Sequence, residues 1–279
     1  MQLSRNLSTE GVDERFAHLD QLDVAQLARV MNDADRGVPE AVERALPQIV
    51  PAIEAIAGRF AAGGRIIYVG AGTSGRLGVL DASECPPTFN TRPDQVLGLI
   101  AGGDVALRSA MEGAEDDAEQ GAADVAAVDV GERDAVVGIA SSGRTPYVIG
   151  ALRHARSVGA VTVALSCNAD AEISAVAEHG IEVVVGPEVV AGSTRLRSGT
   201  AQKMVLNMIS TITMVRAGKV MGNRMVDLRA TNEKLRIRAV RMVSELAGVD
   251  EGVATAALED SDWRVKDAIL ALRGDPVAE

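Results

Sequence analysis

The chain has 279 residues, a formal charge of −11 and 47% hydrophobic residues. This length fits one large domain, or one domain with a helical appendage, and the composition is that of a globular protein that buries a core. The acidic balance, with only one Trp, two Tyr and three Phe, argues against nucleic acid or an anionic membrane as the main partner.

The scarcity of cysteine and histidine excludes several kinds of site. Cys85 and Cys167 are too few for a disulfide framework or a Cys-rich zinc site, and they predict a reducing, cytoplasmic location. The histidines lie far apart in the sequence, so no histidine metal site is predicted. The most apolar stretch, residues 204–215, is shorter than the roughly 18 residues that a membrane span needs, and we expect a core or interface helix there.

Residues 23–63 predict a hairpin of two helices. Apolar side chains recur with helical spacing over residues 24–31 and again over residues 42–56. Pro39 and Pro47 stand near turn or first-turn positions, and Gly63 and Gly64 end the hairpin.

Five short runs rich in β-branched residues follow, and helical patterns such as residues 147–158 separate them. The runs cover residues 65–70, 96–101, 134–140, 161–166 and 181–185. This alternation predicts an α/β fold with a doubly wound, mostly parallel sheet, and ligands then bind outside the carboxyl ends of the strands.

Another strong helix is expected over residues 199–217. Three amphipathic stripes after residue 231 predict a small C-terminal three-helix unit, with Asp260 and Ser261 capping the last helix. The expected domains are an N-terminal helical segment (1–57), a central α/β domain (58–221) and a C-terminal helical domain (232–279).

The first glycine-rich loop, residues 70–75, follows the first strand and opens a helix. It reads GAGTSG and matches the dinucleotide fingerprint, but Asp104, the acid near the end of the second strand where the ribose would need one, lies 29 residues past Gly75 rather than about 20. Thr73 and Ser74 instead suit a phosphate monoester, which backbone N–H groups at a helix N-terminus bind well.

A second loop, residues 140–145, has the same design after the third strand. Its sequence ASSGRT supplies two hydroxyls, a glycine and a hydroxyl at the cap position, and Ser193 belongs to a third hydroxyl cluster. Two such loops on one sheet predict a bound sugar phosphate. The alternative is that these residues are ordinary helix caps.

Two glutamates are candidates for acid–base chemistry. Pro86 disfavours helical geometry at Cys85, so Glu84 is expected in the last turn of its helix, where the dipole favours the protonated acid. Glu115 is expected in or near the first turn of the next helix, where the dipole favours the carboxylate, a candidate base. Both glutamates can equally be solvated surface side chains.

Seven segments together resemble the N-acetylmuramic acid 6-phosphate etherases, a family related to the glucokinase regulatory proteins. The segments are VGAGTSGRLG (69–78), DASECPP (81–87), EGAED (112–116), ASSGRTPY (140–147), GSTR (192–195), GTAQK (199–203) and TNEKL (231–235). The chain departs from the family pattern at residues 11–15, which read GVDER where Arg-Asn usually follows the preceding Ser-Thr-Glu.

The resemblance implies a sugar isomerase (SIS) domain and a lyase that cleaves the D-lactyl ether of N-acetylmuramic acid 6-phosphate, within cell-wall recycling or muramic acid use. It implies that Glu84 protonates the departing lactate and that Glu115 removes the C2 proton. No metal or nucleotide cofactor is implied, and the assembly that the resemblance implies is a homodimer. The residues expected to bind the substrate are Gly72, Thr73, Ser74, Ser141, Ser142, Gly143, Thr145, Ser193 and Lys234.

Three other functions stay open from the sequence. An aldose–ketose isomerase would use a base at C2 but needs no acid for a C3 leaving group, so the Glu84 segment disfavours it. A sugar-phosphate sensor without catalytic activity would not need both glutamates. An NAD-dependent enzyme is supported only by the loop of residues 70–75.

Overall fold

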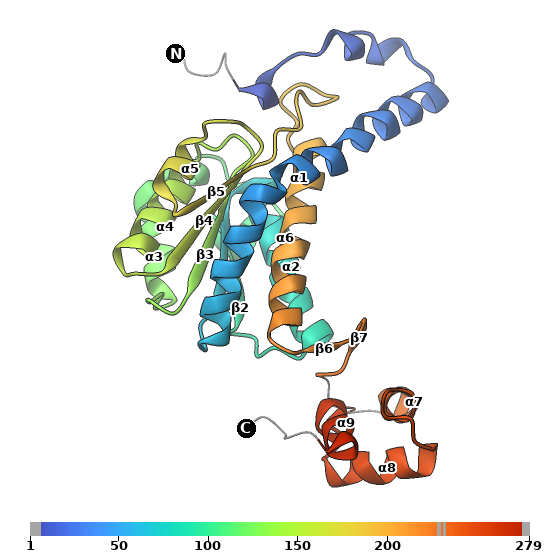
Figure 1. Cartoon of the computed structure of the whole chain (residues 1–279). Coiled ribbons are helices and arrows are strands. Elements are labelled where there is room, and N and C mark those ends of the chain that lie inside the picture. Colours follow the sequence, from blue (N-terminus) through green and yellow to red (C-terminus); the bar gives the residue numbers. More distant parts are fainter. Residues whose placement is uncertain (1–6, 228–229, 231–232, 275–279) are drawn as a thin grey trace. The chain divides into compact units, whose positions relative to one another are not determined.

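A computed structural model describes residues 7–227, 230 and 233–274. Its described part contains a parallel sheet in the order β2-β1-β3-β4-β5 (Figure 1). The strands are β1 (Ile66–Gly70), β2 (Val96–Ile100), β3 (Ala135–Ile139), β4 (Val161–Ser166) and β5 (His179–Glu182). The predicted α/β class and the parallel sheet are confirmed, and β5 begins two residues earlier than its apolar run.

The described residues form two compact units. One unit holds those up to residue 84 together with 92–213, and the other holds 85–91 together with those from 214 onward. The sheet belongs to the first unit, and the C-terminal helices belong to the second.

The predicted N-terminal hairpin is wrong, because a single helix, α1 (Val24–Ala61), spans that region. Asp23 caps it: its side chain accepts from Gln26 N, and the Gln26 side chain accepts from Asp23 N. Pro39, Pro47 and Pro51 all lie inside this helix. One buried apolar stripe runs without a break from Val38 to Phe60, and burial of that stripe outweighs the cost of the prolines.

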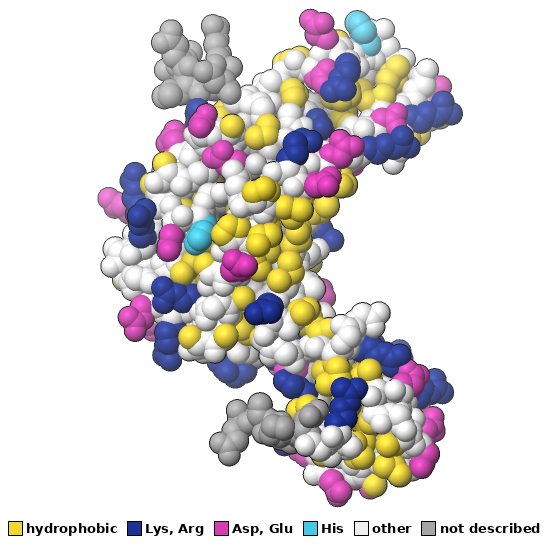
Figure 2. All heavy atoms as spheres, viewed as in Figure 1, with side chains coloured by type: hydrophobic (Ala, Val, Ile, Leu, Met, Phe, Trp, Pro, Cys, Tyr) yellow, Lys and Arg dark blue, Asp and Glu magenta, His cyan; other side chains and the backbone are white. Residues whose placement is uncertain are grey.

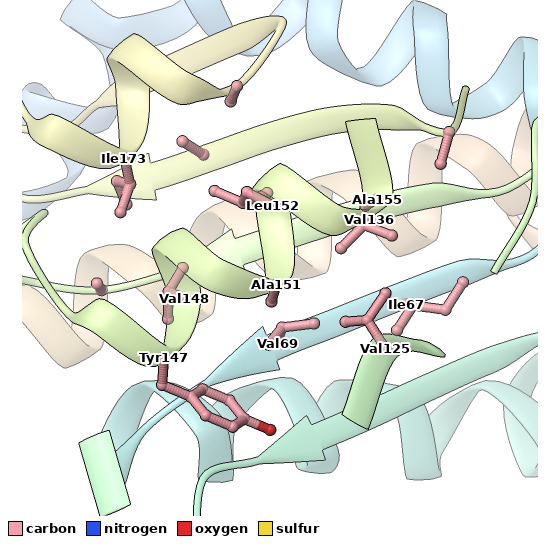
Figure 3. Close-up of a cluster of buried hydrophobic side chains, with 14 of the residues drawn as sticks. Ile67, Val69, Val125, Val136, Tyr147, Val148, Ala151, Leu152, Ala155 and Ile173 are labelled. Atoms are coloured by element: carbon pink, nitrogen blue, oxygen red, sulfur yellow. The ribbon is translucent and has the colours of Figure 1, made fainter. Parts of the chain in front are cut away.

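Helices cover both faces of the sheet. One face carries α3 (Ala118–Ala127), α4 (Pro146–Ser157) and the short α5 (Glu172–Val176). Figure 3 shows its core, where Val69 of β1 lies beside Ala151 of α4 and Ile67 of β1 lies beside Val125 of α3. The other face carries α1, α2 (Gly72–Phe89) and α6 (Arg197–Arg216).

The two helices α3 and α4 touch backbone to backbone. A Cβ atom on Gly121 would lie 1.9 Å from the carbonyl oxygen of Tyr147, and one on Gly150 would lie 1.9 Å from that of Ala118. Tyr147 is fully buried, and its hydroxyl donates a hydrogen bond of 2.6 Å to Asp124 of α3.

The apolar helix predicted at residues 204–215 belongs to α6. It buries Val205, Leu206 and Ile209 and leaves Ile212 38% exposed. Figure 2 shows hydrophobic side chains at the surface over α1 and α6, and Val50 of α1 is one of the exposed apolar residues of the described chain. The described residues contain no helix that is both long and apolar enough to cross a membrane.

The second unit contains the three predicted helices, α7 (Glu233–Ala247), α8 (Glu251–Asp260) and α9 (Val265–Arg273), packed around their own core. A short hairpin of β6 (Val220–Met221) and β7 (Arg224–Met225) precedes them and was not predicted. The expected cap of the last helix is wrong: Asp262 and Trp263 take positive φ angles, so α9 starts only after Arg264.

Short 3-10 turns complete the described chain. They are η1 (Ser8–Glu10), η2 (Glu14–Phe16), η3 (Leu19–Gln21), η4 (Gly103–Leu107) and η5 (Ala114–Asp116).

Candidate functional site

The first glycine-rich loop lies at the carboxyl end of β1, where α2 begins. Gly72 has a φ of +54°, a conformation that favours glycine. A Cβ atom on Gly75 would lie 2.6 Å from Ile100 Cγ1 and 2.7 Å from the carbonyl oxygen of Gly70. Glycine at position 75 therefore lets α2 approach the sheet closely and turns its first N–H groups toward the carboxyl edge.

The second loop lies at the carboxyl end of β3, next to β1, and opens α4. Gly143 has a φ of +73°, and Thr145 is the N-cap residue with Pro146 in the first turn. The Thr145 side chain makes no capping hydrogen bond. The Ser142 hydroxyl accepts a bond of 3.3 Å from the N–H of Arg144, within the turn itself.

The side chain of Gln202, in α6, joins the two loops. Ser74 Oγ donates to Gln202 Oε1 at 3.0 Å, and Gln202 Nε2 donates to Ser141 Oγ at 2.9 Å. All three side chains are buried. The structure thus brings Ser74 and Ser141 close together through Gln202, a residue that the sequence analysis did not single out.

The N-terminal segment is also tied to the second loop. Asn168 Nδ2 donates to the Ser141 carbonyl oxygen and to Thr9 Oγ1, both at 2.9 Å, and Ser8 Oγ donates to Asn168 Oδ1. Thr9 is fully buried. Asn168 thereby fixes both the backbone of the loop and the start of the described chain.

A cavity of about 310 Å³ lies beside the first loop, with Glu115 in its wall. Gly72 lines it from the start of α2, Arg76 lines it one turn further along, and residues 110–114 complete one side. Arg76 Nε donates to the carbonyl oxygens of Ala106 and Leu107, which fixes η4 against α2.

Glu115 lies in the turn η5, just before α3, as expected. Asp117 caps α3 by accepting a bond of 2.8 Å from Gln120 N. The Glu115 side chain is exposed, so water and a ligand can reach it from the cavity.

The expected place of Glu84 in a last helical turn is wrong, because α2 continues through Pro86 and Pro87 to Phe89. Cys85 and Phe89 are buried, and burial of this helix face outweighs the cost of the two prolines. Glu84 lies on the exposed side of α2 and does not line the cavity that contains Glu115. The dipole argument for its role as an acid therefore loses its premise.

Two further predicted residues lie elsewhere. Ser193 is half-buried in the loop before α6, where its N–H donates to the Val190 carbonyl oxygen. Lys234 is exposed on α7, in the second unit.

A buried carboxylate, Asp81, lies three residues before Glu84 and was not predicted. It accepts hydrogen bonds from the Tyr68 hydroxyl at 2.9 Å, from Asn207 Nδ2 at 2.7 Å and from the Ser210 hydroxyl at 3.1 Å. Burial raises the pKa of the Asp81 carboxyl group. Polar residues inside the otherwise apolar α6 were the sequence signal that could have revealed this cluster.

No three His, Cys, Asp or Glu side chains of the described ranges gather closely enough to share a metal ion. The polar groups of the two loops and of the cavity beside them include carboxylates, hydroxyls, backbone N–H groups and the Arg76 guanidinium.

Three family models match the chain. They describe the N-terminal SIS domain of glucokinase regulatory protein (residues 48–156), the SIS domain (117–212) and the C-terminal lid domain of glucokinase regulatory protein (222–278). Together with the parallel sheet and its two loops, these matches define a protein of the SIS class.

Solved structures agree on the fold. Phosphoheptose isomerase GmhA from Neisseria gonorrhoeae superposes with a TM-score of 0.52 and 19% identity, covering 68% of this chain and 97% of that one. A protein of Escherichia coli CFT073, solved as a complex, superposes with a TM-score of 0.51 and 15% identity, covering 72% of this chain and 97% of that one.

Curated relatives are much closer in sequence. The N-acetylmuramic acid 6-phosphate etherase of Streptomyces coelicolor is 57% identical over 96% of this chain and 86% of its own length. That of Mycolicibacterium smegmatis is 55% identical over 95% of this chain and 89% of its own length. The chain belongs to the N-acetylmuramic acid 6-phosphate etherase family, and the predicted family and the predicted lyase class are confirmed.

Proposed function

We propose that the protein cleaves the D-lactyl ether of N-acetylmuramic acid 6-phosphate and releases D-lactate and N-acetylglucosamine 6-phosphate. The observation that carries this proposal is the cavity that Glu115 shares with Gly72 at the start of α2. A carboxylate that can act as a base and a helix start that can bind phosphate face the same space.

The strand order supports a phosphate position between the two loops. The chain reverses direction across the sheet between β1 and β3, since β2 lies on one side of β1 and β3 on the other. The helices that follow these strands, α2 and α4, cover opposite faces, which opens a crevice at the carboxyl edge. First-turn N–H groups of both helices, with the hydroxyls of Thr73, Ser142 and Thr145, would hold the phosphate there.

The reaction needs one base and one acid. In the open-chain sugar the aldehyde acidifies the C2 proton, which Glu115 accepts. The electron pair of the C2–H bond forms the C2–C3 double bond, and the C3–O bond breaks. The lactate oxygen takes a proton from Glu84, and water then adds its hydroxyl at C3 and its proton at C2. The two glutamate roles come from the family resemblance, and so do substrate contacts by Ser193 and Lys234.

The assembly and location belong to the same proposal. A homodimer and a cytoplasmic site of action fit an enzyme that consumes a phosphorylated sugar. The chain has a net charge of −11, so binding of an anionic sugar phosphate needs a locally positive potential at the two loops. The N-termini of α2 and α4 supply this potential.

The decisive experiment is direct. The purified protein is incubated with N-acetylmuramic acid 6-phosphate, and D-lactate is measured with time. We expect stoichiometric D-lactate and N-acetylglucosamine 6-phosphate, and little turnover of unphosphorylated N-acetylmuramic acid. Absence of lactate from the phosphorylated sugar, with the protein folded by circular dichroism, would overturn the proposal.

A further inference from the structure

Among the described residues that line the cavity with Glu115, Arg76 is the only one with a basic side chain. The lining also holds the carboxylates of Glu112 and Glu115, and its other residues are alanine, glycine and methionine. Arg76 and Gly72 are four residues apart in α2, so they lie one turn apart on the same helix face. The cavity thus has one cation beside the candidate base.

Backbone carbonyl groups fix the guanidinium of Arg76 from one side. Nε donates to the carbonyl oxygens of Ala106 and Leu107, both at 3.1 Å, and Nη2 donates to the Ala106 carbonyl oxygen at 2.8 Å. These acceptors are uncharged, and no carboxylate within the described ranges forms an ion pair with Arg76. The half-buried guanidinium is therefore held in one orientation without a neighbouring charge to neutralise it.

The other side of the guanidinium is suited to an anion. The N–H groups of Nη1 have no acceptor among the residues that the structure describes. Neighbouring N–H groups on Nη1 and Nη2 of an arginine match the oxygens of a carboxylate and can bind it through parallel hydrogen bonds. Arg76 therefore suits a carboxylate ligand that enters the cavity.

The proposed substrate carries such a carboxylate. Its phosphate is on C6, where the two loops would bind it, and its second anionic group is the carboxylate of the lactyl group on C3. C3 is bonded to C2, from which Glu115 would take the proton. The lactyl group therefore lies beside Glu115 whenever the substrate is placed for reaction, within reach of the cavity that Arg76 lines.

The walls of the cavity suit the rest of the lactyl group. Ala101 and Ala106 are buried, and Met111 lines the cavity nearer the surface. These apolar side chains can cover the lactyl methyl group. The volume of about 310 Å³ lies at the lower end of the range for ligand pockets, about 300–1,000 Å³, as expected for a site that takes one substituent of a sugar.

Resting on the proposed function, we propose that Arg76 binds the carboxylate of the lactyl group and so determines specificity for a 3-O-lactyl sugar. The guanidinium offsets the repulsion between this carboxylate and Glu115, two negative charges that the cavity would otherwise bring together. The same contact holds the C3–O bond beside the base. Arg76 thus distinguishes the substrate from sugar phosphates that have no carboxylate.

The parent protein tests this contact through its substrate. The lactyl carboxylate of N-acetylmuramic acid 6-phosphate is replaced by a neutral primary amide, and kcat/KM is measured for both sugars. The amide withdraws electrons at least as strongly as the carboxylate, so lactamide is no poorer a leaving group, and a slower reaction reports recognition. Loss of the charge-assisted hydrogen bonds should lower kcat/KM about 10- to 150-fold for the amide. Equal values for the two sugars would overturn the proposal.

The variant Arg76→Met tests the contact from the protein side. It should lower kcat/KM for the carboxylate sugar about 10- to 150-fold, so that the preference over the amide disappears. Arg76→Lys keeps the charge but not the paired N–H groups, and should keep part of the preference. Loss of the bonds that fix η4 would slow both sugars equally, so the ratio of the two values isolates the contact. A parent-like ratio in Arg76→Met would overturn the proposal.

A matched control is Arg108→Met. Arg108 directly follows η4, is exposed and does not line the cavity, so its substitution removes the same charge nearby and should keep the parent ratio. A ratio lowered equally by this control would indicate a general effect of charge and would contradict the contact.

The product separates binding of the carboxylate from binding of the phosphate. N-acetylglucosamine 6-phosphate has the phosphate but no lactyl group, so its inhibition constant should be nearly the same for Arg76→Met and the parent. A rise as large as the loss in kcat/KM for the carboxylate sugar would assign Arg76 to the phosphate and overturn the proposal.

Failure of the proposed function gives a different result. A parent protein that releases no lactate from the phosphorylated sugar overturns the activity, and calorimetric titration then decides the role of Arg76. The parent should bind the carboxylate sugar more tightly than its amide, and Arg76→Met should bind both alike. Equal affinities of the parent for the two sugars would overturn the contact.

Discussion

The hydroxyl group of Ser74, in the first turn of α2, donates a hydrogen bond of 3.0 Å to Oε1 of Gln202 in α6. The same amide continues to the second loop, because Gln202 Nε2 donates to Ser141 Oγ. The direction of these bonds distinguishes the two serines. The Ser74 hydroxyl donates its proton to Gln202, whereas the Ser141 hydroxyl accepts a bond from Gln202 and can donate its own proton to a ligand. We therefore expect Ser141 to be the better phosphate ligand of the two.

Alanine substitution should separate these roles. Ser74→Ala leaves the buried Gln202 Oε1 without its donor, so we expect a loss of about 1–3 kcal/mol in the free energy of unfolding and a nearly unchanged KM. Ser141→Ala should lower stability by a similar amount and also raise KM about 10- to 150-fold, since a bond to a charged group is worth about 1.5–3 kcal/mol. Urea unfolding and steady-state kinetics measure both quantities. An equal rise in KM for both variants would contradict the assignment.

Ser142 tests phosphate binding without disturbing the core. It is half-buried, and its hydroxyl accepts a bond of 3.3 Å from the Arg144 N–H of its own turn. Ser142→Ala should therefore raise KM for the 6-phosphate about tenfold or more while leaving the thermal midpoint nearly unchanged. The weak turnover of unphosphorylated N-acetylmuramic acid should not change. A parallel loss with both sugars would mean that Ser142 contacts another part of the substrate.

The contact between α3 and α4 predicts a large stability effect at Gly150. An added Cβ would lie 1.9 Å from the Ala118 carbonyl oxygen, so Gly150→Ala must push two helices apart. We expect a loss of about 3 kcal/mol or more in the free energy of unfolding. Gly58→Ala is the matched control, because nothing lies within 4 Å of its added Cβ in α1, and it should stabilise the protein by about 0.5–1 kcal/mol. Similar effects at both glycines would contradict the packing.

Asp81 predicts a pH dependence of stability. Burial raises the pKa of its carboxyl group above the ordinary value of 3.8. A carboxyl group with a higher pKa in the folded state binds its proton more tightly when folded, so this stability is present below pH 3.8 and is lost as the pH rises through the folded pKa. Asp81→Asn does not titrate. The stability of the parent relative to this variant should therefore fall as the pH rises from about 3.5, measured by urea unfolding at each pH.

Asp94 supplies a control of opposite sign. Its hydrogen bond from the Arg92 guanidinium lowers the pKa of the Asp94 carboxyl group. The stability of the parent relative to Asp94→Asn should therefore rise with pH over the same range. Slopes of the same sign for Asp81 and Asp94 would contradict the inferred effect of burial.

The strands and both glycine-rich loops could be predicted because their causes are local. A buried parallel strand is an uninterrupted apolar run, as at residues 135–139. Gly75, which must approach the end of β1 closely, stands only five residues after that strand. The start of α8 also has a local cause, since the Asp250 side chain caps this helix.

The wrong predictions concern features that are determined by contacts between residues far apart in the sequence. Proline is a local signal for a break, yet Pro47 and Pro86 lie inside helices whose buried faces continue past them. The bridge by Gln202 was also invisible, since it joins residues 61 and 128 positions away. The sequence predicted that α2 ends near Glu84, whereas the helix continues to Phe89. The predicted last-turn environment of Glu84 was therefore wrong.

The final prediction separates the two glutamates by isotope exchange. If Glu115 is the C2 base, Glu115→Gln should abolish both lactate release and exchange at C2. If Glu84 only protonates the leaving oxygen, Glu84→Gln should block lactate release and leave the base working. Given N-acetylglucosamine 6-phosphate in D₂O, the Glu84→Gln variant should therefore still incorporate deuterium at C2, as detected by NMR or mass spectrometry.

The contrast is large enough to measure, because loss of a general acid or base costs about 10²–10⁴ in rate. It also fits the structure, in which Glu115 lines the cavity at the start of α2 and Glu84 does not. Exchange by the Glu115→Gln variant but not by the Glu84→Gln variant would require the roles to be swapped. If both variants released lactate at the parent rate, neither glutamate would take part in the chemistry, and the residues that line the cavity beside Glu115, Arg76 first among them, would have to be tested in its place.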